Sequence, residues 1–336
     1  MAGAGRILGA ALFLALGGAA GRANDSSIEL AIGGVRFTKS PDVSMEEERL
    51  AITPETVSVS YRFVNRSDAP VTLDIGFPLP DIDLAREDEE LAIPSDDPVN
   101  FVDFRTSVDG APVRLDVIQR AKLKGRDVTA EVKAAGLPLA LIGADAYDRL
   151  RALPAATREK LVADGLLAPN GTGANDEVFY GAQWTVSTVF ARKQTFAPHA
   201  EALVEHHYRA SVGMSVDTAL RKGVRDGDGM EAFLASYRKD YCLNEDFFRG
   251  LDRVAGPVPS AGPTLLERRI AYVLKTGANW AGPIKKFQLT VDKGKPDRLV
   301  SFCFDNVRKA SPTLFVAELE NFTPKRDLKI LMIGRD

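Results

Sequence analysis

The sequence predicts a mainly β, antiparallel, sandwich-like fold with an inserted block of short helices, α+β overall. Three observations predict it: alternating apolar and polar residues recur towards both ends of the chain, turn residues separate these runs, and helix-like segments cluster near the middle. The expected organisation is a signal peptide over residues 1–23, an N-terminal β region over 24–124, a helical insertion over 125–168, and a C-terminal β region over 169–336 with a short helical segment near 230–250.

The first 23 residues have the pattern of a secretory signal peptide. Arg6 supplies a positive start, and residues 7–20 form an apolar core that is too short to span a bilayer. Gly21 and Ala23 place small residues where a signal peptidase reads, so we expect cleavage near Ala23 and a periplasmic or secreted mature chain. An uncleaved N-terminal anchor is the alternative. No later stretch reaches about 18 apolar residues, so the sequence predicts no membrane span after cleavage.

Strand patterns are clearest in the N-terminal region. Apolar and polar residues alternate strictly from Val57 to Phe63, and a period of two places the apolar ones on one buried face. Asp109 and Gly110 separate two further runs, so we expect a hairpin turn there. The other strand patterns cover residues 101–107, 113–117, 178–190, 203–208, 269–276, 287–291 and 328–332.

The middle of the chain reads as helices. Asp127 is a suitable N-cap for a helix over 128–135, and Gly136 is a suitable stop. Two further segments, 144–153 and 155–164, end at Pro154 and Gly165 respectively. A fourth helix is expected over 230–238, inside the C-terminal β region.

The charge balance limits the classes of partner to expect, and the cysteine content bears on the cellular compartment. The chain has 43 Lys and Arg against 46 Asp and Glu and no dominant basic block, which excludes nucleic acid as an expected partner. Its two cysteines, Cys242 and Cys303, both follow the predicted leader, and in an oxidising compartment we expect them to pair. The loop of about 60 residues that they would close is worth about 4 kcal/mol. Two buried free thiols are the alternative.

Catalytic and metal-binding signatures are missing from the sequence. The three histidines are His199, His206 and His207, and the last two are adjacent on a predicted strand, where they point to opposite faces and cannot share a metal ion. Ser236 and Lys239 match a Ser-x-x-Lys pattern, but the elements that accompany it in enzymes are absent. We therefore expect no catalytic residue, no metal and no cofactor.

Two acidic segments are candidates for calcium sites. Residues 226–229, Asp-Gly-Asp-Gly, resemble the start of a calcium loop but lack its later ligands, which favours a polar turn. The acidic run over 81–90 has no fixed ligand spacing, so we interpret it as a solvated loop, with loose Ca²⁺ binding as the alternative.

The candidate ligand-binding residues are aromatic, with polar neighbours. Trp280 follows Asn279 and precedes a Gly-Pro turn, so its indole is a candidate platform for a sugar or a peptide. The alternative is an indole folded back over the sheet, with its N–H on a backbone carbonyl. His207 and Tyr208 form a second candidate pair on a predicted strand. Trp184 begins an apolar strand and is expected in the core.

Several segments of the mature chain carry a family resemblance. They are Gly33-Gly34-Val35-Arg36-Phe37, Phe77-Pro78-Leu79-Pro80, Gly125-Arg126-Asp127-Val128-Thr129, Asn279-Trp280-Ala281-Gly282-Pro283-Ile284 and Lys309-Ala310-Ser311-Pro312-Thr313. Together they resemble the bacterial exported family catalogued as domain of unknown function 4424, over essentially the whole mature chain. The resemblance implies export but supplies no activity.

The sequence therefore predicts an exported envelope protein that acts as a non-catalytic binding or structural module. Its expected partner is an envelope ligand, either a glycan or a protein. Two alternatives are a periplasmic hydrolase that acts on an envelope polymer through carboxylates brought together beside Trp280, and an accessory partner of a membrane assembly.

Overall fold

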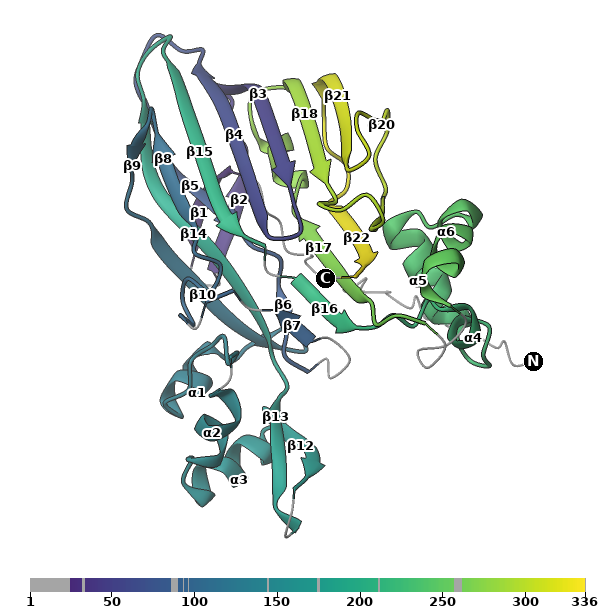
Figure 1. Ribbon diagram of the computed structural model, residues 1–336. Helices are drawn as coiled ribbons and strands as arrows, with labels where there is room; N and C mark the ends of the chain where they lie inside the picture. The colour runs from purple at the N-terminus through teal and green to yellow at the C-terminus, as the bar shows by residue number, and fades with distance from the viewer. Residues whose placement is uncertain are drawn as a thin grey trace, which may run out of the picture.

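The computed structural model describes residues 25–335, except 32–33, 86–89, 93, 96, 144, 174–175, 211 and 257–261. The predicted signal peptide and the cleavage position near Ala23 lie outside the described residues. Within them, the fold is α+β and consists mostly of antiparallel strands, as predicted (Figure 1). None of the described helices combines the length and apolar character needed to cross a membrane.

The largest sheet has eight strands and contains the clearest predicted pattern. Val57, Val59, Tyr61 and Phe63 are all buried on the inner face of β4, which confirms the alternation. The predicted hairpin at Asp109 and Gly110 joins β8 and β9. In sheet order the strands are β20 (Arg308–Lys309), β21 (Leu314–Phe322), β18 (Ile284–Asp292), β3 (Val43–Ile52), β4 (Thr56–Asn65), β15 (Glu201–Arg209), β8 (Arg105–Val108) and β9 (Ala111–Pro112).

A seven-stranded sheet packs face to face on the first. Phe77 of β5 lies 5.0 Å, between ring centroids, from His206 of β15, and Phe190 of β14 stacks on Phe104 at 4.3 Å. These contacts form the inter-sheet core of a sandwich. In order the strands are β11 (Arg126–Asp127), β10 (Asp116–Leu123), β14 (Thr185–Phe196), β5 (Val71–Pro78), β1 (Ser26–Ala31) and β2 (Gly34–Thr38), with β6 (Ile82–Asp83) also paired to β14.

A third sheet has helices on one face. Its strands are β19 (Leu299–Phe302), β22 (Leu328–Gly334), β17 (Leu266–Tyr272), β16 (Val212–Val216) and β7 (Glu90–Ala92), and the helices are α4 (Lys222–Arg225), α5 (Glu231–Tyr241) and α6 (Glu245–Ala255). Leu331 and Ile333 of β22 pack into a separate core with Phe248 and Leu251 of α6. Because both faces of β22 are covered, nearly all of its residues are buried.

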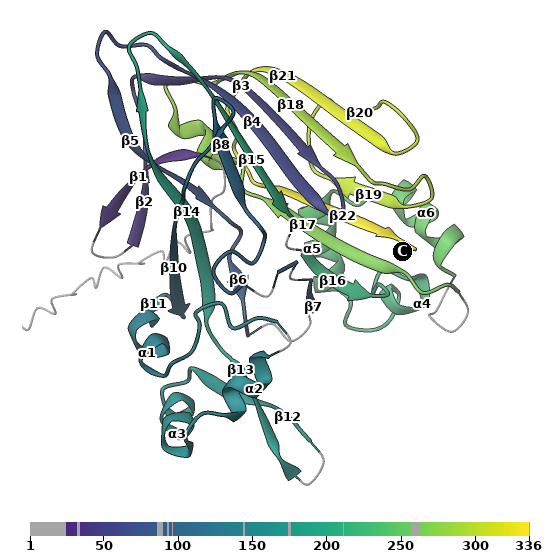
Figure 2. The same cartoon turned by 60° about the vertical axis from the view of Figure 1, so that its left-hand side comes forward.

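The predicted helical insertion projects away from the sheets (Figures 1 and 2). It contains α1 (Thr129–Ala134), α2 (Ala146–Arg151) and α3 (Ala155–Ala163), followed by a two-stranded ribbon, β12 (Leu167–Thr172) and β13 (Val178–Ala182). Trp184 is buried in the core, as predicted, and its indole N–H donates to the carbonyl oxygen of Leu139 at 2.8 Å. This bond ties the loop after α1 to the start of β14.

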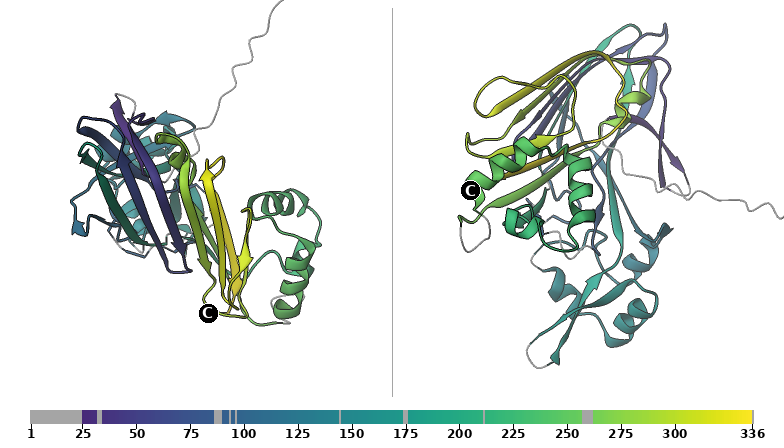
Figure 3. Two further views of the ribbon diagram at one scale, coloured as in Figure 1. Left: turned by 90° about the horizontal axis from the view of Figure 1, so that it is seen from above. Right: turned by 90° about the vertical axis from the view of Figure 1, so that its right-hand side faces the viewer.

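Strands from the two β regions share the same sheets. The ladder between β3 and β18 is parallel, whereas the other ladders between described strands are antiparallel, and it places the N-terminal and C-terminal regions side by side. Figure 3 shows the dark blue strands of the first region beside the yellow and green strands of the second. The two regions are therefore not separate sandwiches.

Cys242 and Cys303 form the predicted disulfide. Cys242 ends α5 in the left-handed conformation, with φ of 54°, and Cys303 follows β19 directly. The bridge consequently fixes the C-terminal end of α5 to the edge of the third sheet.

Candidate functional site

A cavity of about 360 Å³ lies where α5 meets strands of all three large sheets. Its apolar wall comes from residues such as Val57, Phe101 and Ile270. Polar side chains converge on it from five different parts of the chain. These are Asp81, Asp83, Tyr208, Ser236, Tyr237, Asp240, Arg269 and Lys329.

Tyr208 is brought to the cavity by the alternation of β15. Every second residue of this strand is buried, and Tyr208 is the last of the inward-facing set, with 3 % of its surface exposed. Its hydroxyl has no hydrogen-bond partner among the described residues. Burial raises the pKa of Tyr208 above its ordinary value, so the hydroxyl stays protonated and can donate.

Arg269 reaches the cavity from β17, and its cross-strand neighbour is a glycine. A Cβ at Gly213 would lie 3.0 Å from Arg269 Nε, so the missing side chain leaves room for the guanidinium. Arg269 Nη1 donates to Glu267 and, at 3.0 Å, to Ser215 Oγ. The Arg269 side chain is 10 % exposed, and Nη2 has no partner within the described part of the chain.

Glu267 holds the guanidinium in place and balances its charge. Its carboxylate is buried and also accepts from Thr218 Oγ1 at 2.6 Å and from Tyr237 Oη at 2.9 Å. Burial acts to lower the pKa of Arg269, but the charge and hydrogen bond of Glu267, together with smaller contributions from Tyr237 and Tyr241, raise that pKa overall, so the guanidinium stays charged. The Glu267 oxygens are occupied, which leaves Nη2 as the donor available to a ligand.

Asp81 and Asp83 form an acidic rim. Ile82 between them is buried, whereas both aspartates are exposed; Asp81 directly precedes β6 and Asp83 belongs to it. The protein packed around the Asp81 carboxyl raises its pKa to about 6, while Lys122 acts in the opposite direction. Neither carboxylate makes an ion pair with a described residue, although Asp83 accepts from the Ala85 N–H at 3.2 Å.

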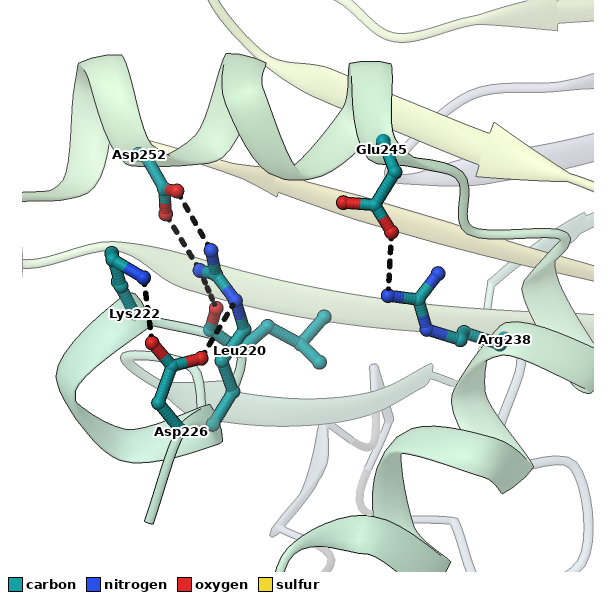
Figure 4. Close-up of polar contacts among 7 residues, drawn as sticks. Leu220, Lys222, Asp226, Arg238, Glu245 and Asp252 are labelled. Carbon is teal, nitrogen blue, oxygen red and sulfur yellow. Dashed lines mark hydrogen bonds and ion pairs between the residues drawn. The ribbon is translucent and has the colours of Figure 1, made fainter.

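Ion pairs and the disulfide fix α5 over the cavity. Figure 4 shows Asp252 and Glu245 on one helix, with Arg238 facing Glu245 from the neighbouring helix; Arg238 Nη2 and Glu245 Oε1 are 2.8 Å apart. Arg225 binds Asp252 through two contacts of 2.6 and 2.7 Å. Lys329 of β22 reaches Asp240 at 2.7 Å. The helix that supplies Tyr237 is thus held from both sides.

The predicted pair Trp280 and Asn279 lies elsewhere and is not exposed as a platform. Trp280 has 3 % of its surface exposed, and its indole N–H donates to the carbonyl oxygen of Asp25 at 2.8 Å. This is the folded-back arrangement given above as the alternative. Asn279 ends a short 3-10 helix, η3 (Lys275–Asn279), and donates to Ser26 Oγ at 2.9 Å. Both residues therefore hold the N-terminal strand β1.

His207 and Tyr208 point to opposite faces of β15. His207 is exposed, and its Nδ1 lies 2.8 Å from the hydroxyl of its cross-strand neighbour Ser58, in an open groove on the outer face of the sheet. His206 faces inward, against Asp25 at 3.0 Å. Only Tyr208 of the predicted candidates lines the cavity. Among the described residues, no three His, Cys, Asp or Glu side chains come together as metal ligands.

Sequence reasoning missed most of this site. The acidic run, interpreted as a solvated loop, supplies two exposed residues, Asp81 and Asp83, to the cavity lining, and Asp83 belongs to the short strand β6 with the buried Ile82. Residues 86–89 of that run lie outside the described part. The sequence signal for this part of the site is the spacing of Glu267 and Arg269, which places two opposite charges on the same face of a strand. Asp226 is in a polar turn as predicted, paired with Lys222 at 2.6 Å.

Sequence comparison assigns the family. The family model described as domain of unknown function (DUF4424) matches residues 23–331. The chain belongs to this family. Comparison with curated proteins gives no match.

Solved structures show weaker likenesses to this DUF4424 member. One is a provisionally assigned nutrient-binding protein of Legionella pneumophila, with 14 % identity, a TM-score of 0.41, and coverage of 93 % of this chain and 72 % of that one. Another is an M1 zinc metallopeptidase of Deinococcus radiodurans, with 8 % identity, a TM-score of 0.26, and coverage of 88 % and 43 %. These scores are too low to transfer a function to this chain.

Proposed function

We propose that this protein is an exported binding protein that takes a small polar solute into the cavity beneath α5. One observation carries the proposal: Tyr208 Oη and Arg269 Nη2 are both buried, both belong to residues that line this cavity, and both lack a partner among the described residues. A buried polar group without a hydrogen bond costs about 1–3 kcal/mol. Folded proteins rarely retain two such groups at one place unless something binds them.

The size and the walls of the cavity support a small ligand. Small-molecule pockets span about 300–1,000 Å³ and combine apolar walls with a few polar groups. At about 360 Å³ this cavity lies at the lower end of that range, and it has both kinds of lining. A single solute fits this description better than a glycan chain or a protein surface does. A cleft with two carboxylates beside Trp280 would favour the hydrolase alternative, whereas the Trp280 side chain is buried.

Export is part of the proposal. The signal-peptide-like start and the disulfide between Cys242 and Cys303 support a periplasmic or secreted location, because such bonds persist in oxidising compartments. A fusion of residues 1–23 to a reporter that is active only outside the cytoplasm tests this part directly.

The binding claim is tested by thermal unfolding of the mature chain with separate sets of amino acids, sugars, nucleosides and organic acids. A ligand at about 100 times its Kd stabilises the folded state by about 2.7 kcal/mol, which raises Tm by several degrees. We expect one set to produce such a shift.

A blocking variant locates the site. Ser236 is exposed on α5 and lines the cavity, so Ser236→Trp should fill its entrance at little cost to folding. Ala235 is an exposed neighbour on the same helix that does not line the cavity, and Ala235→Trp is the matched control. The shift should disappear in the first variant and persist in the second. A wild-type protein that none of the sets stabilises, or a shift that survives in Ser236→Trp, would contradict the proposal.

A further inference from the structure

We infer that the ligand is a zwitterionic α-amino acid, with its ammonium group at the Asp81 and Asp83 rim and its carboxylate at Tyr208 and Arg269. This inference rests on the proposed function and specifies the ligand of the same cavity. It follows from the positions, among the described residues, of two carboxylates without an ion-pair partner, at the rim, and of two buried hydrogen-bond donors without an acceptor, further inside.

The rim is suited to a cation. Two internal pairs, Arg269 with Glu267 and Lys329 with Asp240, balance their own charges. Asp81 and Asp83 are left, and they carry the excess negative charge of the cavity lining. The ring of Tyr237 lines the same space and adds a face that attracts an ammonium group. Asp81 and Asp83 are exposed residues, whereas Tyr208 is buried, so the rim is the end of the cavity nearer to solvent.

The inner end is suited to a carboxylate. Tyr208 Oη and Arg269 Nη2 are hydrogen-bond donors without a partner in the described protein, and each is buried. A carboxylate accepts several hydrogen bonds and binds guanidinium groups with favourable geometry. Because Glu267 fixes the guanidinium through Nη1, the ligand meets a donor that is already oriented.

Other ligand classes satisfy only one end. A simple amine would leave the two inner donors unbonded, and a simple acid would bring no charge to the acidic rim. A neutral sugar would bond to the donors but leave both rim carboxylates uncompensated. Because the rim holds two carboxylates, amino acids with basic side chains should bind more tightly than those with acidic ones.

Isothermal titration of the mature chain with the proteinogenic L-amino acids tests the inference. For the tightest ligand, two matched probes follow: the amine that lacks the carboxylate and the acid that lacks the ammonium group. Each lost charged hydrogen bond should weaken binding about 10–100-fold.

Two variants assign the ends. Asp81→Asn should weaken the amino acid and the matched amine but leave the matched acid unchanged, and Tyr208→Phe should weaken the amino acid and the acid but not the amine. Asp74→Asn is the control, because Asp74 is a partly exposed residue of β5, paired with Lys193, that does not line the cavity. Its Kd should equal that of the wild type.

The outcomes separate this inference from the proposed function. If a sugar, a nucleoside or a simple acid binds more tightly than every amino acid, and Ser236→Trp abolishes that binding, the proposed function holds and the zwitterion assignment is wrong. If the matched amine or acid binds as tightly as the amino acid, the assignment is equally wrong. If no solute of any class binds, the proposed function fails as well.

Discussion

Replacing Tyr208 with phenylalanine should stabilise the unliganded protein by about 1 kcal/mol. The hydroxyl is buried and has no partner among the described residues, so folding removes it from water without compensation. That desolvation costs about 1–3 kcal/mol in proteins. Removing the oxygen also leaves a small void beside the cavity, which offsets part of the gain, so a net value near the lower end is expected.

A second buried tyrosine provides the matched control. Tyr61 is fully buried, but its hydroxyl lies 2.9 Å from that of Tyr272. Tyr61→Phe removes one partner of a buried hydrogen bond, so it should destabilise the protein by about 1–2 kcal/mol. The same chemical change thus has opposite signs at the two positions, for a reason that the structure identifies.

Urea unfolding at pH 7, followed by tryptophan fluorescence, measures both effects through the shift in midpoint at constant slope. A loss of 1 kcal/mol or more in the free energy of unfolding of Tyr208→Phe would show that the hydroxyl is bonded in solution and would contradict this prediction. The prediction is also refuted if both variants change stability by the same amount. A gain in stability together with a loss of ligand binding is the pattern expected of a binding residue.

Three further outcomes follow from the buried charges and the disulfide. Arg192→Met should lower the free energy of unfolding by about 3–5 kcal/mol, because it removes the guanidinium that lies 2.9 Å from the buried Asp25 carboxylate. Lys193→Met, which breaks an exposed pair with Asp74, should change the free energy of unfolding by less than about 1 kcal/mol in the same urea assay. Burial alone would raise the pKa of Asp25, but the charges of Arg192 and His206 outweigh it and hold this pKa well below its ordinary value of 3.8. The stability that this ion pair contributes is fully present above pH 3.8 and is lost as the pH falls further. Urea midpoints measured from pH 7 to pH 3 should therefore begin to decrease once the pH is below about 4 in the wild type. The decrease should be less steep in Asp25→Asn. Replacing Cys242 and Cys303 together by serine should lower the free energy of unfolding by about 4 kcal/mol, because the bridge spans 61 residues. It should also weaken solute binding, because it releases the end of α5. Unchanged isothermal titration of the double variant would contradict this role.

Much of the fold could be predicted from the sequence because its signals are local. The alternation from Val57 to Phe63 specifies a strand with one buried face whatever it packs against, and Gly136 and Pro154 mark the ends of helices for purely steric reasons. The disulfide was predictable because the sequence contains only two cysteines and its start predicts export to a compartment where cysteines pair. These features depend on neighbouring residues or on composition, so no tertiary information was needed.

The candidate site could not be predicted in the same way, because it depends on long-range packing. Tyr208, Arg269 and Asp81 meet only after three sheets and a helix have assembled, and nothing in the local sequence of any one indicates the others. Trp280 shows the opposite case. Its polar and turn-forming neighbours are typical of an exposed platform, yet the carbonyl of Asp25 and the rings around it make it a core residue.

The parallel ladder between β3 and β18 affects the order in which the strands can pair during folding. The hairpin of β3 and β4 needs only a short turn, so it can form early, whereas the partner on the other edge of β3 is separated from it by most of the chain. Until Ile284 and the residues after it are available, that edge presents unpaired N–H and C=O groups, which other chains can join. A fragment that stops before Ile284 is therefore expected to aggregate. In the intact protein, folding is expected to be slow, with this ladder forming late.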